Sequence, residues 1–315
     1  MKIKLYGTRG SIPISNKDSV IHGGNTTCLR IFDDAIPNNM ALIIDSGSGF
    51  VPLSKDILKD EKITDIFILY THYHIDHTLG LFLSPLTFIK HYNITVLGPL
   101  ENDMGGREMM ENLMISPYFP VDIREVKSHF EYKAIKTPNA RVIIIGKEGF
   151  TAIDMDHYDL LVKHNEYIPI GKGKFPLEDC LIIKMFKTNH PEKTLSYSMV
   201  NNKTKEKFVF LTDHENHDGI SRNLLNHLKD ANLAIMDCQY SRKKYDANCG
   251  GFGHATPDYC VRLAEHCGVK SLGLTHHDPD STDADIDNIL AEAKECLKNK
   301  DIKIFTCKDY QEIEL

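Results

Sequence analysis

The chain has 315 residues, of which 42% are hydrophobic and 26% charged, and its formal net charge at pH 7 is −7. These values are typical of a folded protein with a substantial core, and no stretch approaches the ~20 apolar residues of a membrane span. The acidic balance argues against a generic nucleic-acid binder, and no signal-peptide pattern follows Met1, so we expect a cytoplasmic protein.

The first part of the chain alternates strand-like runs with glycine-rich loops. We predict strands at residues 2–6, 28–32, 40–44 and 65–70, and a short helix at 52–59. Glycine-rich loops follow the first and third of these strands and precede the second. Such loops suit a site built at one edge of a sheet, where the backbone approaches a ligand closely.

The strand at 65–70 runs directly into Thr71-His72-Tyr73-His74-Ile75-Asp76-His77. An extended backbone places His72 and His74 on the same side, so their imidazoles can hold one cation. Asp76 and His77 follow where the chain turns, so they point elsewhere and can serve a second cation. A polar loop with three histidines is the alternative, but four potential ligands within six residues after a strand favour metal binding.

The later part of the chain continues the strands and adds helices. We predict strands at 94–97, 142–145, 181–186, 196–200, 208–211, 233–236 and 302–305, and helices at 108–114, 257–267 and 283–298. Residues 147–180 mix charges, glycines and isolated aromatics, and we interpret them as an insertion with short strands and as a candidate lid. Strands with interspersed helices and no linker predict one layered α/β domain over residues 1–315.

The His-x-His-x-Asp-His pattern resembles the signature of the metallo-β-lactamase superfamily, and the chain is identified as a member. The resemblance implies a four-layer αββα sandwich, with further ligands (a His, an Asp and a His) at later strand ends. His190, Asp213 and His276 meet this demand, and His277 is the alternative to His276. By resemblance, one metal is held by His72, His74 and His190, the other is held by Asp76, His77 and His276, and both are bridged by Asp213.

A second motif, Gly251-Phe252-Gly253-His254-Ala255-Thr256, resembles the Gly-His-Ser/Thr loop of ribonuclease Z and related cyclic-nucleotide phosphodiesterases. In those enzymes the histidine stabilises the transition state and transfers a proton. His254 is therefore a candidate catalytic residue, and Asp76 of the metal-ligand set is the second candidate. Ribonuclease Z itself is a weaker match, because its long basic arm for gripping transfer RNA is not evident. Glyoxalase II shares the ligand set but lacks the loop.

The resemblance predicts a dinuclear metal-dependent hydrolase, a phosphodiesterase that cleaves a small or cyclic phosphodiester through a metal-bridged hydroxide. A thioester or lactone hydrolase like glyoxalase II is the alternative on the same metal site. The expected cofactors are two divalent ions, zinc first and manganese or iron as alternatives. The expected partner is a small-molecule phosphodiester; the sequence makes no strong case for a nucleic acid and none for a membrane, and a homodimer is compatible with it.

Overall fold

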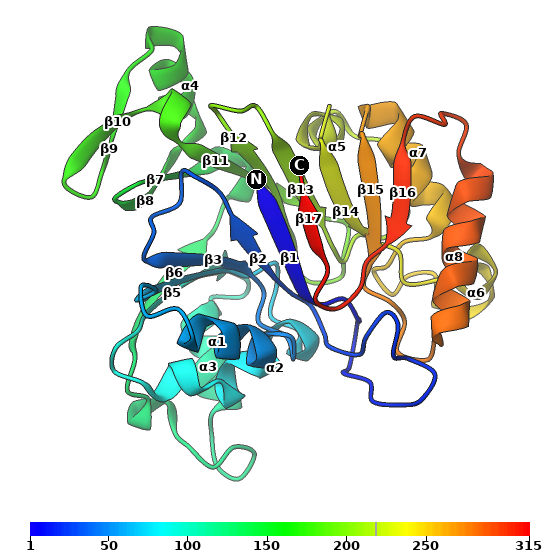
Figure 1. The fold of residues 1–315 in the computed structure, drawn as a ribbon, viewed down its shortest axis with the longest axis horizontal. Helices are drawn as coiled ribbons and strands as arrows, with labels where there is room; N and C mark the ends of the chain where they lie inside the picture. Colours follow the sequence, from blue (N-terminus) through cyan, green and yellow to red (C-terminus); the bar gives the residue numbers. More distant parts are fainter. Residues whose placement is uncertain (218) are drawn as a thin grey trace.

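Two β-sheets lie face to face, with helices on both outer sides, in the computed structural model, which describes residues 1–217 and 219–315 (Figure 1). The four-layer αββα arrangement expected from the sequence is confirmed.

The first sheet has seven strands in the order β17-β1-β2-β3-β4-β5-β6. They are β1 (Lys2–Gly7), β2 (Cys28–Phe32), β3 (Met40–Ile44), β4 (Asp65–Leu69), β5 (Asn93–Pro99), β6 (His129–Ile135) and β17 (Glu312–Glu314). Strands β3 to β6 run parallel, and β1 shares their direction because β2 is antiparallel to both β1 and β3. The carboxyl ends of these five strands therefore lie at one edge of the sheet.

The second sheet has eight strands in the order β16-β15-β14-β13-β12-β11-β7-β8. They are β7 (Arg141–Gly146), β8 (Gly149–Asp154), β11 (Leu181–Lys187), β12 (Leu195–Asn201), β13 (Lys207–Leu211), β14 (Leu233–Asp237), β15 (Ser271–Thr275) and β16 (Lys303–Thr306). Strands β13 to β16 run parallel, and β11 shares their direction through the antiparallel β12. The ends of β11, β13, β14 and β15 thus also share one edge.

Each sheet is covered on its outer face by amphipathic helices. The first sheet carries α1 (Phe50–Leu58), α2 (Ile75–Leu83) and α3 (Gly106–Leu113), and the second carries α5 (Arg222–Leu228), α7 (Pro257–Cys267) and α8 (Asp283–Cys296). The bounds of α7 are those expected from its apolar periodicity, and Gly268 ends it with a φ of 67°. In the described ranges, none of the helices has the length and hydrophobicity needed to cross a membrane. The cytoplasmic location stays a prediction.

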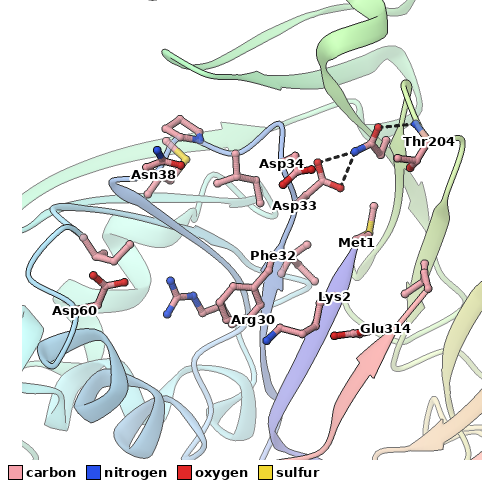
Figure 2. Close-up of a pocket in the computed structure, with 17 residues that line it drawn as sticks. Met1, Lys2, Arg30, Phe32, Asp33, Asp34, Asn38, Asp60, Thr204 and Glu314 are labelled. Atoms are coloured by element: carbon pink, nitrogen blue, oxygen red, sulfur yellow. Dashed lines mark hydrogen bonds between the residues drawn. The ribbon is translucent and has the colours of Figure 1, made fainter.

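The chain termini meet on the first sheet, where β1 pairs with β17. Beside them lies a cavity of about 550 Å³ lined by Arg30, Asp33 and Glu314 among others (Figure 2). Asp33 accepts two hydrogen bonds from the amide of Asn201, at 2.9 and 3.0 Å, which joins β2 to the end of β12. The seven predicted metal ligands are absent from the described lining of this cavity.

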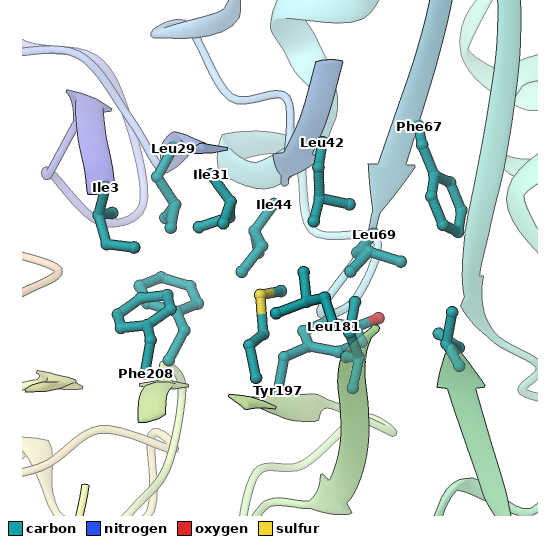
Figure 3. Packing of buried hydrophobic residues seen from close by; sticks show 14 of the residues in the cluster. Ile3, Leu29, Ile31, Leu42, Ile44, Phe67, Leu69, Leu181, Tyr197 and Phe208 are labelled. Carbon is teal, nitrogen blue, oxygen red and sulfur yellow. The ribbon is translucent and has the colours of Figure 1, made fainter. Parts of the chain in front are cut away.

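The core between the sheets is formed by alternate residues of facing strands (Figure 3). Leu42 and Leu69 of the first sheet pack towards Leu181 and Tyr197 of the second, because successive side chains of a strand point to opposite faces. Hydrogen bonds also join the sheets at the start of the histidine-rich segment 71–77. The Leu195 N–H donates to the Thr71 carbonyl at 2.8 Å, and the Tyr197 hydroxyl donates to the Tyr70 carbonyl at 2.6 Å. These contacts hold the two sheet edges together.

Residues 147–180 form β8, the helix α4 (Met155–His164), the hairpin of β9 (Tyr167–Ile170) and β10 (Gly173–Pro176), and a short 3-10 turn. This segment projects from one end of the molecule (Figure 1). Tyr158, Leu161 and Ile168 pack on Ile144 and Ile182 of the second sheet. The short strands agree with the sequence-based expectation, whereas α4 is a helix that the sequence pattern did not reveal.

Candidate metal centre

The seven predicted ligand residues lie together where the two sheet edges meet. Each follows a strand of one of the two sheets: His72, His74, Asp76 and His77 come after β4, His190 after β11, Asp213 after β13 and His276 after β15. Asp76 and His77 occupy the first turn of α2, and the ring centroids of His77 and His72 lie 4.3 Å apart.

The first group of potential ligands is His72, His74, His190 and Asp213, with one ligand atom from each lying within 4.8 Å of the others. Oδ2 of Asp213 lies 3.6 Å from Nε2 of His72 and 3.7 Å from Nε2 of His190. His74 is exposed, and its Nε2 lies 3.1 Å from a carboxylate oxygen of Glu192. Nδ1 of His74 therefore remains for a metal.

The second group is Asp76, His77 and His276. Oδ2 of Asp76 lies 3.4 Å from Nε2 of His77 and 3.3 Å from Nε2 of His276. Oδ1 of Asp213 lies 3.4 Å from the same two nitrogen atoms. The two oxygen atoms of Asp213 thus face one group each, which is the geometry that a bridging carboxylate requires.

These distances suit metal coordination. A tetrahedral ion with bonds of ~2.1 Å separates its ligand atoms by about 3.4 Å. Nε2 of His72 is buried and has no hydrogen-bond partner among the described residues. A buried polar atom without a partner is unfavourable, and a cation between His72 and Asp213 would satisfy it. The residues present therefore fit two divalent cations.

Polar residues behind the cluster orient the imidazoles. Nδ1 of His77 lies 2.8 Å from a carboxylate oxygen of Asp45, which also accepts hydrogen bonds from the backbone and hydroxyl of Thr71. Nδ1 of His276 lies 2.8 Å from Oε1 of Gln239. Such partners fix the tautomer and leave the other ring nitrogen for a metal. The sequence indicated neither role, although both residues follow predicted strands.

Three residues of the site adopt left-handed backbone conformations, namely Asp45, Asp213 and His276, with φ of 56°, 49° and 61°. Each lies within two residues of the end of its strand. Aspartate and histidine tolerate this region better than most side chains, but it still costs of order 1–3 kcal/mol per residue. This strain turns each chain sharply at the shared edge.

His254 lies against the second group, within the described loop before α7. Its ring stacks on that of His276, with centroids 4.9 Å apart and an interplanar angle of 23°. Its Nδ1 lies 2.8 Å from a carboxylate oxygen of Asp237, at the end of β14. His254 also forms a third group of potential ligands with Asp213 and His276, in which one ligand atom of each lies within 4.8 Å of the others.

The loop that carries His254 is held tightly. Glu215 accepts hydrogen bonds from the backbone N–H groups of Gly251 at 2.6 Å and Gly253 at 2.7 Å. Gly253 has a φ of 93°, and a Cβ there would lie 2.3 Å from the imidazole of His190. Only glycine lets this backbone approach the cluster so closely. The importance of Glu215 could not be inferred from the sequence.

Burial and neighbouring charges act against each other at His254. Burial disfavours the protonated imidazole, but the carboxylates of Asp237, Asp213 and Asp76 outweigh burial and raise the pKa of His254 to about 9. In contrast, burial and the neighbouring His77 hold the pKa of His72 well below its usual value. A neutral imidazole is the form that binds a metal.

Two other histidines lie outside both groups. Nε2 of His277 donates to the carbonyl of Cys307 at 2.9 Å, and burial lowers the pKa of His277 to about 3. From the sequence, we predict that His214 is a loop residue. It is buried, accepts a hydrogen bond from the backbone of Asn189 and lies 2.9 Å from the hydroxyl of Tyr259. His214 therefore supports the loop of His190.

A cavity of about 380 Å³ opens beside the first group. It is lined by His72, His74, Met104, Glu192 and Lys193 among others. Its described lining contains nothing from residues 147–180, so this segment does not act as a lid over this cavity.

A protein-family model described as "Beta-lactamase superfamily domain" matches residues 42–277. The chain belongs to this superfamily. The metallo-beta-lactamase fold protein YhfI from Bacillus subtilis superposes over 100% of this chain and 99% of its own, with a TM-score of 0.64 at 18% identity. The protein is thus a hydrolase of the metallo-β-lactamase superfamily, and its fold and His/Asp cluster imply divalent metal ions.

Similar sequences include proteins named ribonuclease Z. The one from Clostridium acetobutylicum is 25% identical over 96% of this chain and 95% of its own length. The one from Lachnospira eligens is 26% identical over 89% of this chain and 88% of its own.

These relatives named ribonuclease Z contradict the expectation that the protein has no nucleic-acid partner. That expectation rested on the net charge of −7 and on the missing basic arm. Net charge is a sum over the whole molecule, whereas a nucleic acid responds to the local field at its binding surface, including the charge of any bound metal. The expectation was therefore wrong.

Proposed function

We propose that the protein is a two-metal phosphodiesterase, with His254 as the residue that protonates the leaving group. The observation that carries the proposal is the pair of His254 and Asp237, which places a polarised imidazole against the seven candidate ligands. A cluster that only stores metal has no need of such a group. The relatives named ribonuclease Z support a phosphodiester as the substrate.

We assign one metal to His72, His74 and His190 and the other to Asp76, His77 and His276, with Asp213 bridging both. When bound, two divalent ions would attract a phosphoryl oxygen and favour the deprotonation of water. Zinc is the metal we propose first because imidazole-rich sites suit it, with manganese and iron as alternatives.

The protein residues then have separate tasks. The backbone N–H of Ser11 donates to Oδ2 of Asp76 at 2.7 Å. This hydrogen bond fixes the carboxylate in the position where it would hold a metal together with His77 and His276. His254 donates from Nε2 to the leaving-group oxygen, while Asp237 holds the ring in one orientation. Asp76 is thus a catalytic residue through its position in the metal site, and His254 through proton transfer.

RNA is the first candidate substrate, because the relatives named ribonuclease Z align over most of this chain. A small or cyclic phosphodiester is the second candidate. It is favoured by the cavity beside His74, whose volume of about 380 Å³ is within the ~300–1,000 Å³ typical of small-molecule sites.

The test is a substrate panel with the purified, metal-analysed protein. It contains an RNA with a 3′ extension, a 2′,3′-cyclic nucleotide, bis(p-nitrophenyl) phosphate, a thioester and a lactone. We expect hydrolysis of the phosphodiesters, and we expect Asp213→Ala to remove both metal equivalents and the activity together. The Asp237→Asn variant should keep its metal but lose activity.

Turnover of the thioester or lactone alone would overturn the phosphodiesterase proposal in favour of a glyoxalase II-like hydrolase. Metal binding without turnover of any member of the panel would also contradict it. Cleavage of the RNA but not of the cyclic nucleotide would select the first candidate substrate over the second.

A further inference from the structure

A third cavity, of about 360 Å³, lies on the outer face of the second sheet. Its floor is formed by β11, β12 and β13, and its walls by α4 and α5. Ser198 lies at the centre of the floor, opposite Lys184 in the strand register. A small side chain at this central position leaves room that a larger one would fill.

The cavity carries two lysines and no carboxylate among its described lining residues. The ammonium of Lys184 lies 4.8 Å from the centroid of the Tyr158 ring, and Lys207 donates to the backbone carbonyl of Lys229 at 2.8 Å. Within the described ranges, neither lysine has a carboxylate within 4.0 Å, although the whole chain carries more acidic than basic residues. No carboxylate of the described lining therefore pairs with either lysine, and Asp230 acts on Lys207 from outside the cavity.

Lys207 is half-buried in this cavity. Burial lowers the pKa of Lys207 to about 8; the charge of Asp230 opposes this shift, and that of Lys184 acts in the same direction. His227, on the neighbouring wall, adds no charge because burial lowers its pKa to about 3. A bound anion would relieve the repulsion between the two lysines.

The rest of the lining suits a planar, polar ring. Tyr158 and Phe186 offer aromatic surfaces, and the amide-bearing residues Asn139, Asn202 and Asn223 surround the space. Amide side chains offer both donors and acceptors, which is what the edge of a nucleobase requires. Among the described lining residues, the seven candidate metal ligands are absent, so this cavity is separate from the metal centre.

We propose that this cavity binds a small organic phosphate that carries a planar ring, with a nucleoside monophosphate as the representative ligand. Lys184 and Lys207 hold the phosphate, Tyr158 and Phe186 contact the ring, and the asparagines pair with its edge. The cavity volume lies within the ~300–1,000 Å³ of typical ligand sites. This inference does not depend on the proposed phosphodiesterase activity.

The experiment is calorimetric titration of the metal-loaded protein with AMP, with adenosine and inorganic phosphate as separate arms. We expect AMP to bind and Lys184→Gln to weaken that binding by roughly tenfold or more, because a charge-assisted contact is lost. Ser198→Met, which fills the floor while keeping both lysines, should weaken it as well. Thermal unfolding verifies that both variants are folded.

Lys203→Gln is the matched control, because Lys203 lies on the neighbouring hairpin, pairs with Asp179 at 3.6 Å and is outside the cavity. It should leave the dissociation constant for AMP within about twofold, in the range of surface ion-pair effects. AMP binding that is lost in His254→Ala but kept in Lys184→Gln would assign the ligand to the metal centre and overturn the proposal. Absence of saturable AMP binding, or equal binding of phosphate alone, would overturn it too.

Discussion

At the scale of single residues, the candidate metal centre depends on acidic residues that are not ligands. Asp45 orients His77, and Asp237 orients His254, each at 2.8 Å. Both carboxylates are almost completely buried. A buried carboxylate beside an imidazole selects one tautomer, so the opposite nitrogen faces the reacting groups. We assign different roles to the two histidines, because His77 matches the ligand pattern of the superfamily, whereas His254 lies on the glycine loop before α7.

His254→Ala should lower kcat by ~10²–10⁴, the range for a positioned acid–base group, while both metal equivalents remain. The reason is that His254 contacts the cluster without belonging to the seven assigned ligands. Steady-state kinetics and elemental analysis of the same sample measure the two effects. His266→Ala is the control, because His266 is exposed on α7. Loss of one metal equivalent in His254→Ala would show that it is a ligand.

At the scale of elements, the position of His254 depends on its glycine loop. Glu215 holds this loop through Gly251 and Gly253 and also accepts a hydrogen bond from the Tyr245 hydroxyl at 2.6 Å. One carboxylate therefore satisfies three donors, two of which belong to the loop backbone. A small displacement of this loop would move the proton donor relative to the substrate.

Glu215→Gln should reduce kcat by roughly tenfold to a hundredfold, because misplacing a catalytic group by ~1 Å has effects of that size. The amide nitrogen of glutamine would face a donor and lose at least one of the three hydrogen bonds. KM and metal content should change little. Glu295→Gln, an exposed change of the same kind on α8, is the control. Full activity in Glu215→Gln would mean that the glycines alone position the loop.

Another connection between elements rests on Asp309, which joins the loop before β17 to the loop before β2. Its carboxylate accepts hydrogen bonds from the backbone of Gly24 and Asn25, both at 3.0 Å. Burial raises the pKa of Asp309 from 3.8 to about 6, although these hydrogen bonds act in the opposite direction.

Because this pKa is higher in the folded than in the unfolded chain, the contribution of Asp309 to stability should fall as the pH rises from about 4 to 6. Relative to Asp309→Asn, the free energy of unfolding of the natural protein should fall by about 3 kcal/mol at most over this window. Urea unfolding of both proteins at several pH values measures the difference. A difference that is constant between pH 4 and 7 would contradict this prediction.

At the scale of the whole molecule, we propose that residues 1–315 form a single domain, with residues 147–180 inserted into it. The sheets take strands from both halves of the chain, and β17 returns from the C-terminal end to pair with β1. The core between the sheets likewise joins Ile3 and Leu5 to Phe208 and Phe210. Neither half could bury its inner sheet face without the other.

Since the ligands come from both sheets, metal removal should destabilise the whole molecule. Binding at ~100 times Kd contributes about 2.7 kcal/mol per site, so chelation should lower Tm by roughly 10 °C. Calorimetry before and after chelation, with elemental analysis, measures the change. Asp213→Ala should have a low Tm that chelation hardly alters. An unchanged Tm after confirmed metal loss would show that the apoprotein cluster is stable by itself.

The sequence by itself determined the features that depend on neighbouring residues. Strand β3 has the predicted bounds, as does α7, because each pattern is local and periodic. The segment 71–77 after β4 likewise holds four of the candidate ligands within six residues. The edge strand β6 and the helices α4 and α5 were not predicted, because each is at most ten residues long and partly exposed, so its pattern is short.

Only the tertiary structure decided which distant groups meet. The partnership of Asp237 with His254, the support of the glycine loop by Glu215 and the choice between His276 and His277 all depend on contacts across the chain. His276 and His277 are adjacent, yet a φ of 61° at His276 leaves its ring in the cluster while that of His277 turns to Cys307. The direction of a side chain at a strand end follows from backbone torsion and packing, which the order of residues does not display.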